Sequence, residues 1–403
     1  MHILVLNSGS SSIKFSVFEV GENVRFGDPK SLYEGEISGI GMPGNRLKFH
    51  DAAGQDLTGK RAESKIDSAA DAIRVVMDLV LGSDMPTMDA VGYRVVHPGA
   101  KLKGHCKITD EVLRELEAAA EFAPLHDPAA VAMIRAAMQR IPDAPHFACF
   151  DTVFHESMQE AATSYALPQE IRDRGVRRYG FHGLSCESIV RQILNAVECG
   201  TMKFPQRLVI AHLGSGCSVT AVEQGRSLDT TMGLTPTGGV VMGTRPGDLD
   251  PGLMLYLLRQ HGATVESVEH MVNHAAGMVA LSGLKNDMKS VREATAAGDA
   301  RATLAIEVFT RSVRKAIGSF VWLMGGVDAI VFAGGIGEHD AATWKEILEG
   351  LEEMGIVLDE TLDNAKEDGV RRVSATKSSV AVFVIPSEED QMIAVHVLEM
   401  MAE

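Results

Sequence analysis

Two glycine-rich stretches near the middle of the chain combine residues that are suited to phosphate chemistry. An apolar run at 208–211 leads into a Gly-Ser-Gly turn at 214–216, and a second strand-like run follows at 218–223. Consecutive backbone N–H groups at such a turn form a concave site for phosphate oxygens. A further glycine-rich stretch at 237–247 contains a lone arginine, Arg245. A phosphate cradle that is followed by an arginine on a loop predicts phosphoryl transfer.

The same order of strand, small-residue turn and strand occurs at the N-terminus. The apolar run 3–6 is followed by the turn 7–12 and by a strand-like run at 13–20. A third glycine turn, 334–339, follows an apolar run, and such a junction offers N–H groups and a helix dipole to an anion. The three turns together indicate nucleotide phosphates, and the first two predict a duplicated phosphate-binding hairpin.

Ionisable side chains lie at the ends of several predicted strands. Arg94 and His97 end one strand-like run, and Asp151 directly follows another. His126 and His182 each lie between an apolar residue and a predicted helix start. A single histidine in such a place is more often structural than catalytic, but the shared position favours a common cleft. Site residues of open α/β sheets gather at the carboxyl ends of the strands.

Two other motif matches are rejected. The run from Gly54 to Arg61 resembles a P-loop, but it lacks the Ser/Thr that would hold magnesium, and no apolar strand precedes it. His270 and His274 have the spacing of zinc-binding histidines, but the glutamate of a zinc-protease helix is absent between them. We interpret these two as ordinary helical histidines.

Strand-like and helical runs alternate along the chain, which predicts the α/β class. A chain of 403 residues is long for a single hydrophobic core, so two domains are expected. The pattern restarts after Asp151, and the repeat places the boundary near residue 150.

The net charge and the cysteines indicate which binding partners and which cellular compartment to expect. A formal net charge of −16 argues against non-specific binding to nucleic acid or to an anionic membrane. The five cysteines are scattered and include no C-x-x-C pair, as is typical of reduced cytosolic thiols. No signal peptide or long apolar span is recognisable, so we expect a soluble cytoplasmic protein without membrane partners.

Six motifs, in order along nearly the whole chain, resemble those of the acetate kinases, the acetokinase family. These motifs are Asn7-Ser8-Gly9-Ser10-Ser11-Ser12-Ile13-Lys14, Tyr93-Arg94-Val95-Val96-His97, Phe150-Asp151-Thr152-Val153-Phe154-His155, Arg178-Tyr179-Gly180-Phe181-His182-Gly183, Met242-Gly243-Thr244-Arg245-x-Gly247-Asp248-x-Asp250-Pro251 and Gly335-Ile336-Gly337-Glu338.

The resemblance implies an α/β fold of two duplicated, actin-like ATPase (ribonuclease H-like) domains with the active site in an interdomain cleft. Residues 1–150 would form the N-terminal domain, and residues 151–385 the nucleotide-binding domain. The C-terminal helix, 386–403, would pack back on the first domain. Members of the family form homodimers, which is the assembly we expect here.

The reaction implied by the resemblance is reversible transfer of the ATP γ-phosphoryl group to acetate, giving acetyl phosphate and ADP by direct in-line transfer. The enzyme would be a phosphotransferase with a carboxyl group as acceptor and would use Mg²⁺ or Mn²⁺. A carboxylate is already ionised at neutral pH, so the acceptor needs positioning rather than a general base. The partners would be a small carboxylate and a nucleotide.

The family pattern assigns a role to each matching residue. Arg94 would bind the carboxylate, Arg245 and His182 would stabilise the transferring group, and Asp151 would orient Arg94 or act as an acid or base. His126 would contact phosphate. A small apolar acyl pocket would be formed by Val96, Leu125, Phe181 and Pro236. Magnesium would be contacted by Asn7 and Glu389. The nucleotide would be held by Lys14, His212, Leu213, Gly214, Ser215, Gly216, Asp287, Met288, Lys289, Gly335, Ile336, Gly337, Glu338 and His339.

Four departures from the family pattern all fall on the nucleotide and metal side. Ser215 replaces an asparagine, Lys289 an arginine and His339 an asparagine, and 387–390 reads Ser-Glu-Glu-Asp in place of Thr-Asn-Glu-Glu. A pyrophosphate-dependent enzyme therefore stays open as an alternative donor specificity. Propionate stays open as a second acceptor, because one methylene changes discrimination by only about 1–3 kcal/mol. A non-catalytic, actin- or chaperone-like nucleotide-binding protein is the alternative from another class.

Overall fold

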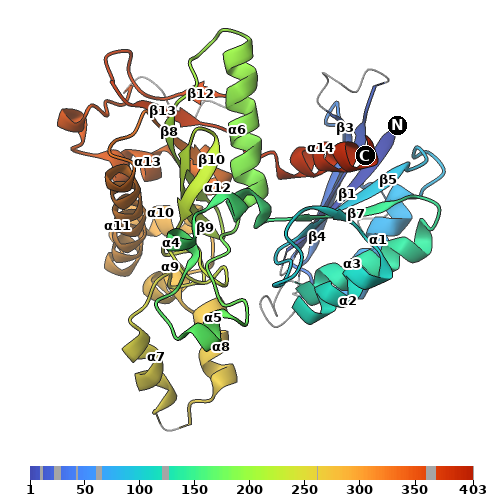
Figure 1. Ribbon diagram of the computed structural model, residues 1–403, viewed down its shortest axis with the longest axis horizontal. Coiled ribbons are helices and arrows are strands. Elements are labelled where there is room, and N and C mark those ends of the chain that lie inside the picture. The colour runs from blue at the N-terminus through green and yellow to red at the C-terminus, as the bar shows by residue number, and fades with distance from the viewer. Residues whose placement is uncertain are drawn as a thin grey trace. The chain divides into compact units, whose positions relative to one another are not determined.

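The computed structural model describes residues 1–9, 12–21, 29–41, 44–59, 66–119, 127–260, 262–359 and 369–402. The chain forms two compact units (Figure 1). Unit 1 comprises Met1–Val153 and Glu388–Glu403, and unit 2 comprises Phe154–Ser387. Asp151 thus lies in unit 1, although the repeat-based division after residue 150 would assign it to the second domain.

Unit 1 contains a seven-stranded sheet with helices on both faces. Its strands are β1 (His2–Ser8), β2 (Ser12–Glu19), β3 (Lys30–Ser38), β4 (Arg46–Asp51), β5 (Ala90–Val95), β6 (Cys106–Lys107) and β7 (His146–Phe150). Its helices are α1 (Ala69–Val80), α2 (Asp110–Ala118), α3 (Asp127–Arg140) and α14 (Glu389–Ala402).

Alternation along β5 shows which helices cover which face of this sheet. Val91 and Tyr93 lie in the hydrophobic core that α1 and α3 complete. Gly92 points the opposite way, because successive residues of a strand face opposite sides. A Cβ on Gly92 would lie 2.7 Å from Ile393 and 2.8 Å from Val397, both of α14. Helix α14 therefore packs on the face opposite to α1 and α3 and needs glycine there (Figure 1).

Unit 2 contains a six-stranded sheet. Its strands are β8 (Arg207–Leu213), β9 (Cys217–Glu223), β10 (Arg226–Thr230), β11 (Ala329–Ala333), β12 (Arg371–Arg372) and β13 (Ala381–Val384). Its helices are α4 (Glu160–Thr163), α5 (Gln169–Arg172), α6 (Gly183–Glu198), α7 (Pro251–Leu258), α8 (Val265–His274), α9 (Gly277–Ser282), α10 (Met288–Ala296), α11 (Ala300–Leu323), α12 (Gly334–His339) and α13 (Ala341–Leu348).

Apart from the additional edge strand β4, the two sheets have the same strand order. The first runs β4-β3-β2-β1-β5-β7-β6 and the second β10-β9-β8-β11-β13-β12. The antiparallel part has four strands in the first sheet, β4 to β1, and three in the second, β10 to β8. In each sheet two parallel strands follow, and a two-residue antiparallel strand, β6 or β12, closes the edge. This shared order is what a duplicated domain predicts, and the predicted α/β class is confirmed.

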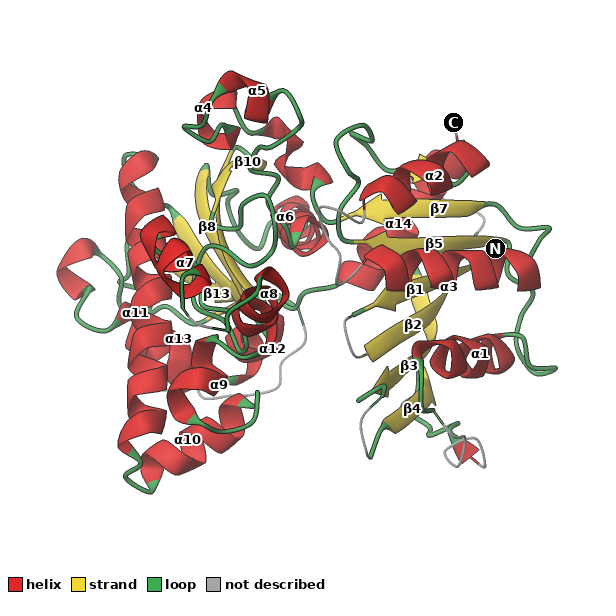
Figure 2. Ribbon diagram, turned by 90° about the horizontal axis from the view of Figure 1, so that it is seen from below, coloured by secondary structure: helices red, strands yellow, loops and turns green. Residues whose placement is uncertain are grey.

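Helices also cover both faces of the second sheet. Apolar residues of α6, including Ile189 and Ile193, share a core with alternate residues of β8 and β11 such as Ile210 and Val331. Helix α11 packs against β8 and β9 from the other side, as both views show (Figures 1 and 2). In the described part of the chain, no helix is long and apolar enough to cross a membrane.

Candidate active site

Arg94, at the end of β5, is the centre of a buried polar cluster in unit 1. Its Nε lies 3.0 and 3.1 Å from the two carboxylate oxygens of Asp151, and its Nη2 donates to Oδ2 at 2.5 Å. Its Nη1 donates to Oδ1 of Asn7 at 3.2 Å. Asp151 is only 1% exposed. The guanidinium is therefore held in one orientation by a bidentate ion pair.

Two further carboxylates approach this cluster from the first turn of α14. Glu389 lies 3.9 Å from Nε of Arg94. Asp390 accepts from Nδ2 of Asn7 at 3.0 Å and from Oγ of Ser16 at 2.9 Å. Asp390 was not predicted as a site residue, although it follows Glu389 directly in the acidic run 388–390.

Burial and the neighbouring charges shift the pKa values of the ionisable groups in this cluster. Burial raises the pKa of Asp151 above its ordinary value, and the ion pair with Arg94 opposes that effect. Burial alone would lower the pKa of Arg94, but Asp151, Glu389 and Asp390 raise it above its ordinary value. Burial also raises the pKa of Asp390. Arg94 is thus a permanent cation that faces more than one carboxylate.

Strand register explains why these residues meet. Asn7 and Arg94 are Cα partners in the parallel pair of β1 and β5, and the N–H of Asp151 donates to Val95 O at 3.2 Å. The three side chains therefore extend from the carboxyl ends of three neighbouring strands, as the strand-end argument predicted.

The remaining predicted residues of unit 1 fall in different places. Lys14 is exposed on β2, where it is the Cα partner of Asn7. Val96 is buried directly after β5. Leu125 and His126 lie outside the described residues.

In unit 2, His182 and His212 form a stacked pair. Their ring centroids are 4.2 Å apart with an interplanar angle of 26°. His182 precedes α6 in the left-handed region, with φ 59°, which is uncommon for a residue other than glycine. His212 lies near the end of β8. Both rings are buried.

The Gly-Ser-Gly turn lies beside these histidines and beside Arg245. A Cβ on Gly216 would lie 3.3 Å from Nε2 of His182 and 3.6 Å from Nη1 of Arg245. A Cβ on Gly214 would lie 3.9 Å from Nε2 of His212 and 4.0 Å from the backbone nitrogen of Gly335. The first and third glycine turns, both histidines and Arg245 are therefore gathered in one region of unit 2.

The loop of Arg245 is held by backbone hydrogen bonds to α9. The N–H groups of Met278 and Val279 donate to the carbonyls of Met242 and Gly243, each at 3.0 Å. Nη1 of Arg245 donates to the carbonyl of Pro236 at 2.9 Å. Pro236, predicted to line the acyl pocket, therefore lies next to the arginine.

The carboxylate of Glu338 accepts hydrogen bonds from two backbone N–H groups. Its Oε1 accepts from the N–H of Gly334 at 2.9 Å and from the N–H of Ser387 at 3.0 Å. Helix α12 begins at Gly334 itself, so the predicted glycine turn is already helical. Of the neighbouring predicted residues, Gly335 and His339 are exposed, Ile336 is half-buried and Gly337 is buried.

Asp287 is the N-cap of α10 and accepts from the N–H groups of Lys289 and Ser290. Asp287 and Lys289 are exposed, and Met288 is half-buried. The residue before them, Asn286, packs so closely on Gly243 that a Cβ there would lie 2.0 Å from its Oδ1. This packing links the segment to the Arg245 loop.

Three further predicted residues complete the set in unit 2. Ser215 is exposed at the tip of its turn, whereas Leu213 before it is fully buried. Phe181 is buried, and its carbonyl accepts a hydrogen bond from Nε2 of His155 at 3.0 Å. Because Phe181 precedes His182, this bond helps to hold the histidine in its unusual backbone conformation.

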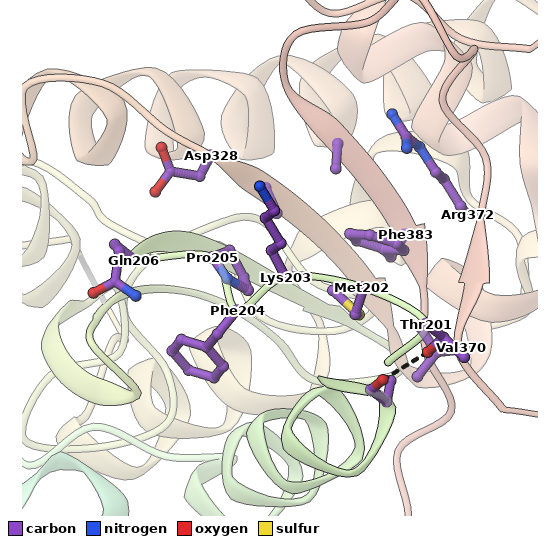
Figure 3. Close-up of a pocket in the computed structure, with 13 residues that line it drawn as sticks. Thr201, Met202, Lys203, Phe204, Pro205, Gln206, Asp328, Val370, Arg372 and Phe383 are labelled. Carbon is purple, nitrogen blue, oxygen red and sulfur yellow. Dashed lines mark hydrogen bonds between the residues drawn. The ribbon is translucent and has the colours of Figure 1, made fainter. Parts of the chain in front are cut away.

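A cavity of about 470 Å³ in unit 2 is separate from these residues (Figure 3). It is lined by the connection from α6 to β8 and by the first residues of β11 and β13, among them Lys203, Phe204, Ala329 and Phe383. It therefore lies at the amino ends of the parallel strands. The predicted phosphate-binding turns follow the carboxyl ends, so this cavity is not the candidate site.

Two like sheets, glycine turns after the strands, and arginine and histidine groups beside those turns define an α/β phosphotransferase. Residues 2–395 match the model of the acetokinase family. The chain therefore belongs to the acetokinase family. Family membership does not favour the non-catalytic alternative.

Individual relatives and solved structures match over almost the whole chain. The acetate kinase of Micrococcus luteus is 39% identical over 400 residues, which cover 98% of both chains. The acetate kinase of Bacillus subtilis is 37% identical over 400 residues, or 97% of both. Acetate kinase from Porphyromonas gingivalis superposes with a TM-score of 0.84 at 32% identity and 99% coverage of both chains. A propionate kinase from Francisella tularensis superposes with a TM-score of 0.85 at 34% identity and 98% coverage of both.

Proposed function

We propose that this protein is an acetate kinase, which transfers the γ-phosphoryl group of ATP reversibly to acetate and forms acetyl phosphate and ADP. The observation that favours this function most is the meeting of His182, Arg245 and the Gly216 turn in one region of unit 2. Two potential donors beside a turn of backbone N–H groups suit a transferring phosphoryl group, whose charge lies on its equatorial oxygens.

Arg94 is the residue we assign to the acceptor. Acetate is ionised at neutral pH, so a fixed cation that neutralises its charge serves it better than a general base. Asp151 holds the guanidinium through Nε and Nη2, and this bidentate pair fixes the direction of the remaining donors. Asp151 is therefore assigned to positioning, because its carboxylate is already committed to Arg94.

Arg245 and His182 are assigned to the transferring group. Both are fixed before substrate arrives, Arg245 by the carbonyl of Pro236 and His182 by Ser218. Preorganised donors cost no reorganisation during the reaction, which is the basis of electrostatic catalysis. The in-line step forms a bond from a carboxylate oxygen to the γ-phosphorus and breaks the bond from that phosphorus to the ADP oxygen.

The oxygen-rich cluster of unit 1 fits a divalent magnesium ion. Glu389 offers a carboxylate next to Arg94, and Oδ1 of Asn7 retains a second lone pair beside its bond to Arg94. Carboxylate and amide oxygens are the ligands that magnesium prefers, and the ion keeps several of its waters. When bound, the ion would neutralise charge on the phosphates.

The glycine turns and the departures from the family pattern bear on the phosphoryl donor. We assign Lys14, 212–216, 287–289 and 335–339 to the nucleotide. Ser215, Lys289 and His339 are all exposed and can reach a ligand. Val96, Phe181 and Pro236 are assigned to the acyl group.

We also propose that the protein acts as a homodimer in the cytoplasm. All five cysteines are free thiols, as a reducing compartment requires. None of the residues of helix α7 is buried, even though many of them are apolar. The apolar side chains of this helix are 38–58% exposed at Leu253, Leu255, Tyr256 and Leu258. An apolar helix without a buried face suits burial against a second copy.

Hydroxylamine trapping of acyl phosphate tests the function. The purified protein is offered ATP or pyrophosphate with acetate or propionate, each pair in the presence of Mg²⁺. We expect the most hydroxamate with ATP and acetate. Preference for pyrophosphate or propionate would reassign the donor or the acceptor, and no hydroxamate with any pair would refute the kinase.

A further inference from the structure

Two histidines and two serines of unit 2 form a crossed set of hydrogen bonds. His182 and Ser185 lie three residues apart at the start of α6, and His212 is the Cα partner of Ser218 in β8 and β9. Nδ1 of His182 lies 3.0 Å from Oγ of Ser218, and Nδ1 of His212 lies 2.8 Å from Oγ of Ser185. Each histidine is thus held by the serine of the other element.

The four residues are buried, so their hydrogen bonds cannot exchange freely with water. Ser185 and Ser218 are 0% exposed, His182 8% and His212 9%. The stacking of the two rings adds a second restraint on their orientation. Nδ1 of each ring contacts a serine, and Nε2 of each ring lies on the side of the glycine turns.

Nε2 of each ring lies beside a glycine turn. A Cβ on Gly334 would lie 3.1 Å from Nε2 of His212, and a Cβ on Gly216 would lie 3.3 Å from Nε2 of His182. The absence of a side chain at these two glycines leaves room beside each Nε2. Each imidazole therefore places its second nitrogen against one of the proposed phosphate turns.

The hydrogen bond between Ser387 and Ser185 favours one tautomer of His212. Oγ of Ser387 donates to Oγ of Ser185 at 3.0 Å. The single hydroxyl hydrogen of Ser185 is then available to Nδ1 of His212, which would make this nitrogen an acceptor. A neutral imidazole with an acceptor at Nδ1 bears its hydrogen on Nε2.

We propose that Ser185 and Ser218 are positioning residues that fix the two imidazoles, and that Ser185 sets His212 as an Nε2–H donor toward the phosphates. The role of His212 as a donor to the phosphates rests on the proposed kinase function. Its tautomer can be established whether or not the protein is a kinase. Glu338 belongs to the same arrangement, because its carboxylate holds both Gly334 and Ser387. One carboxylate thus supports the glycine turn and the serine that orients Ser185.

Nitrogen NMR of the full-length protein tests the tautomer directly. Two-bond ¹H–¹⁵N correlations of ¹⁵N-histidine distinguish Nδ1–H from Nε2–H, and His212→Gln assigns the signal. We expect Nε2–H for His212 in the wild type and in Ser185→Thr, and a mixed or Nδ1–H signal in Ser185→Ala. Ser188→Ala is the matched control, because Ser188 lies on the same helix, is 3% exposed and accepts from Gln192.

Steady-state kinetics of the same variants is the second measurement. Loss of one oriented hydrogen bond corresponds to about tenfold in affinity, so Ser185→Ala should raise the KM for ATP about tenfold and leave the KM for acetate nearly unchanged. Ser387→Ala is a second variant with the same expected direction if Ser185→Ala does not fold. A folded Ser185→Ala protein that keeps the Nε2–H signal and the wild-type KM for ATP would overturn the proposal. Loss of the tautomer in a protein without kinase activity would refute the proposed function alone.

Discussion

Arg245 shows how one side chain is prepared for phosphate by its surroundings. Its Nη1 is held by the carbonyl of Pro236, and its loop is bonded to α9. The residue type, the glycine-rich loop and the family pattern made Arg245 predictable from the sequence. The carbonyl that orients it was not predictable, because a backbone acceptor leaves no trace in residue type.

Substitution Arg245→Ala should lower kcat by on the order of a hundredfold or more, because one preorganised stabiliser of the transition state is lost. The KM for acetate should change far less. Arg226→Ala is the control, since Arg226 is exposed on β10 in the same unit. Near-normal turnover of Arg245→Ala in the acetyl phosphate assay would remove its assigned role.

His155 makes stability depend on pH. It is 1% exposed, it contacts Ser227 and Phe181, and burial lowers the pKa of its imidazole to about 4 from the ordinary 6.5. The unfolded chain then binds the proton more tightly between these values. Stability should be complete above about pH 6.5 and fall progressively toward pH 4, by about 3 kcal/mol at most.

Urea unfolding of the wild type and of His155→Gln at several pH values measures this effect. The variant is expected to be less stable at pH 7.5, because Phe181 and Ser227 lose their partner, but its stability should fall less between pH 6.5 and 4.5. Parallel pH curves for the two proteins would show that His155 is not responsible.

Some residues of the two polar clusters were predictable from the sequence and others were not. Arg94 and Asp151 were predicted from strand ends, and the structure joins them. Asp390, Ser185 and Ser218 were missed, because a single serine or a second acidic residue in a run has no distinctive pattern. Their importance arises only when register and helix phase bring them together.

At the scale of elements, the α9 junction holds the Arg245 loop through a close backbone approach. Gly277, the first residue of α9, has φ 64°, and a Cβ there would lie 2.3 Å from Met242 O and 2.6 Å from Arg245 O. An alanine would force the two segments apart.

Gly277→Ala should therefore lower kcat at least tenfold, because a displacement of the loop misplaces Arg245. Gly298→Ala is the matched control: its φ is +88°, so it shares the backbone strain, but nothing lies within 4 Å of the added Cβ. Equal kinetic effects of the two substitutions would attribute the loss to backbone strain rather than to contact with the Arg245 loop.

Helix α7 tests the proposed assembly. Substitution Leu255→Glu or Tyr256→Glu should convert the dimer into a monomer, since a charge cannot be buried cheaply in an apolar interface. Sedimentation velocity measures the state. The control is Leu304→Glu, because Leu304 is also an exposed leucine (47%) but lies on α11. This substitution should leave the dimer intact. A monomeric wild type, or a dimer unaffected at both positions, would contradict the α7 interface.

The principal elements were predictable, but the edges of the sheets were not. The alternation of strand-like and helical runs predicted the class, and the long helix α11 begins at a recognisable N-cap, Asp299. Strands β6 and β12 have two residues each and leave no hydrophobic alternation to detect. Strand β10 was also missed, because its Arg-Ser-Leu-Asp-Thr sequence is largely polar.

The two units share a strand order, but they carry different kinds of side chain at equivalent strand ends. Asn7 pairs with Arg94 between β1 and β5, and His212 pairs with Ala333 at the same place between β8 and β11. Unit 1 thus presents a cation surrounded by carboxylates, whereas unit 2 presents histidines and glycine turns. The internal repeat was visible in the sequence, but the division of tasks between its copies became assignable only with the register of the strands.

In the proposed reaction, an acetate oxygen attacks the γ-phosphorus of ATP directly. Phosphorus NMR of a mixture of the enzyme, Mg²⁺, ATP and acetate labelled with ¹⁸O in both carboxyl oxygens tests it. We expect ADP together with acetyl phosphate whose phosphorus signal is shifted by one bonded ¹⁸O. Acetyl phosphate without that shift, or no acetyl phosphate at all, would contradict it.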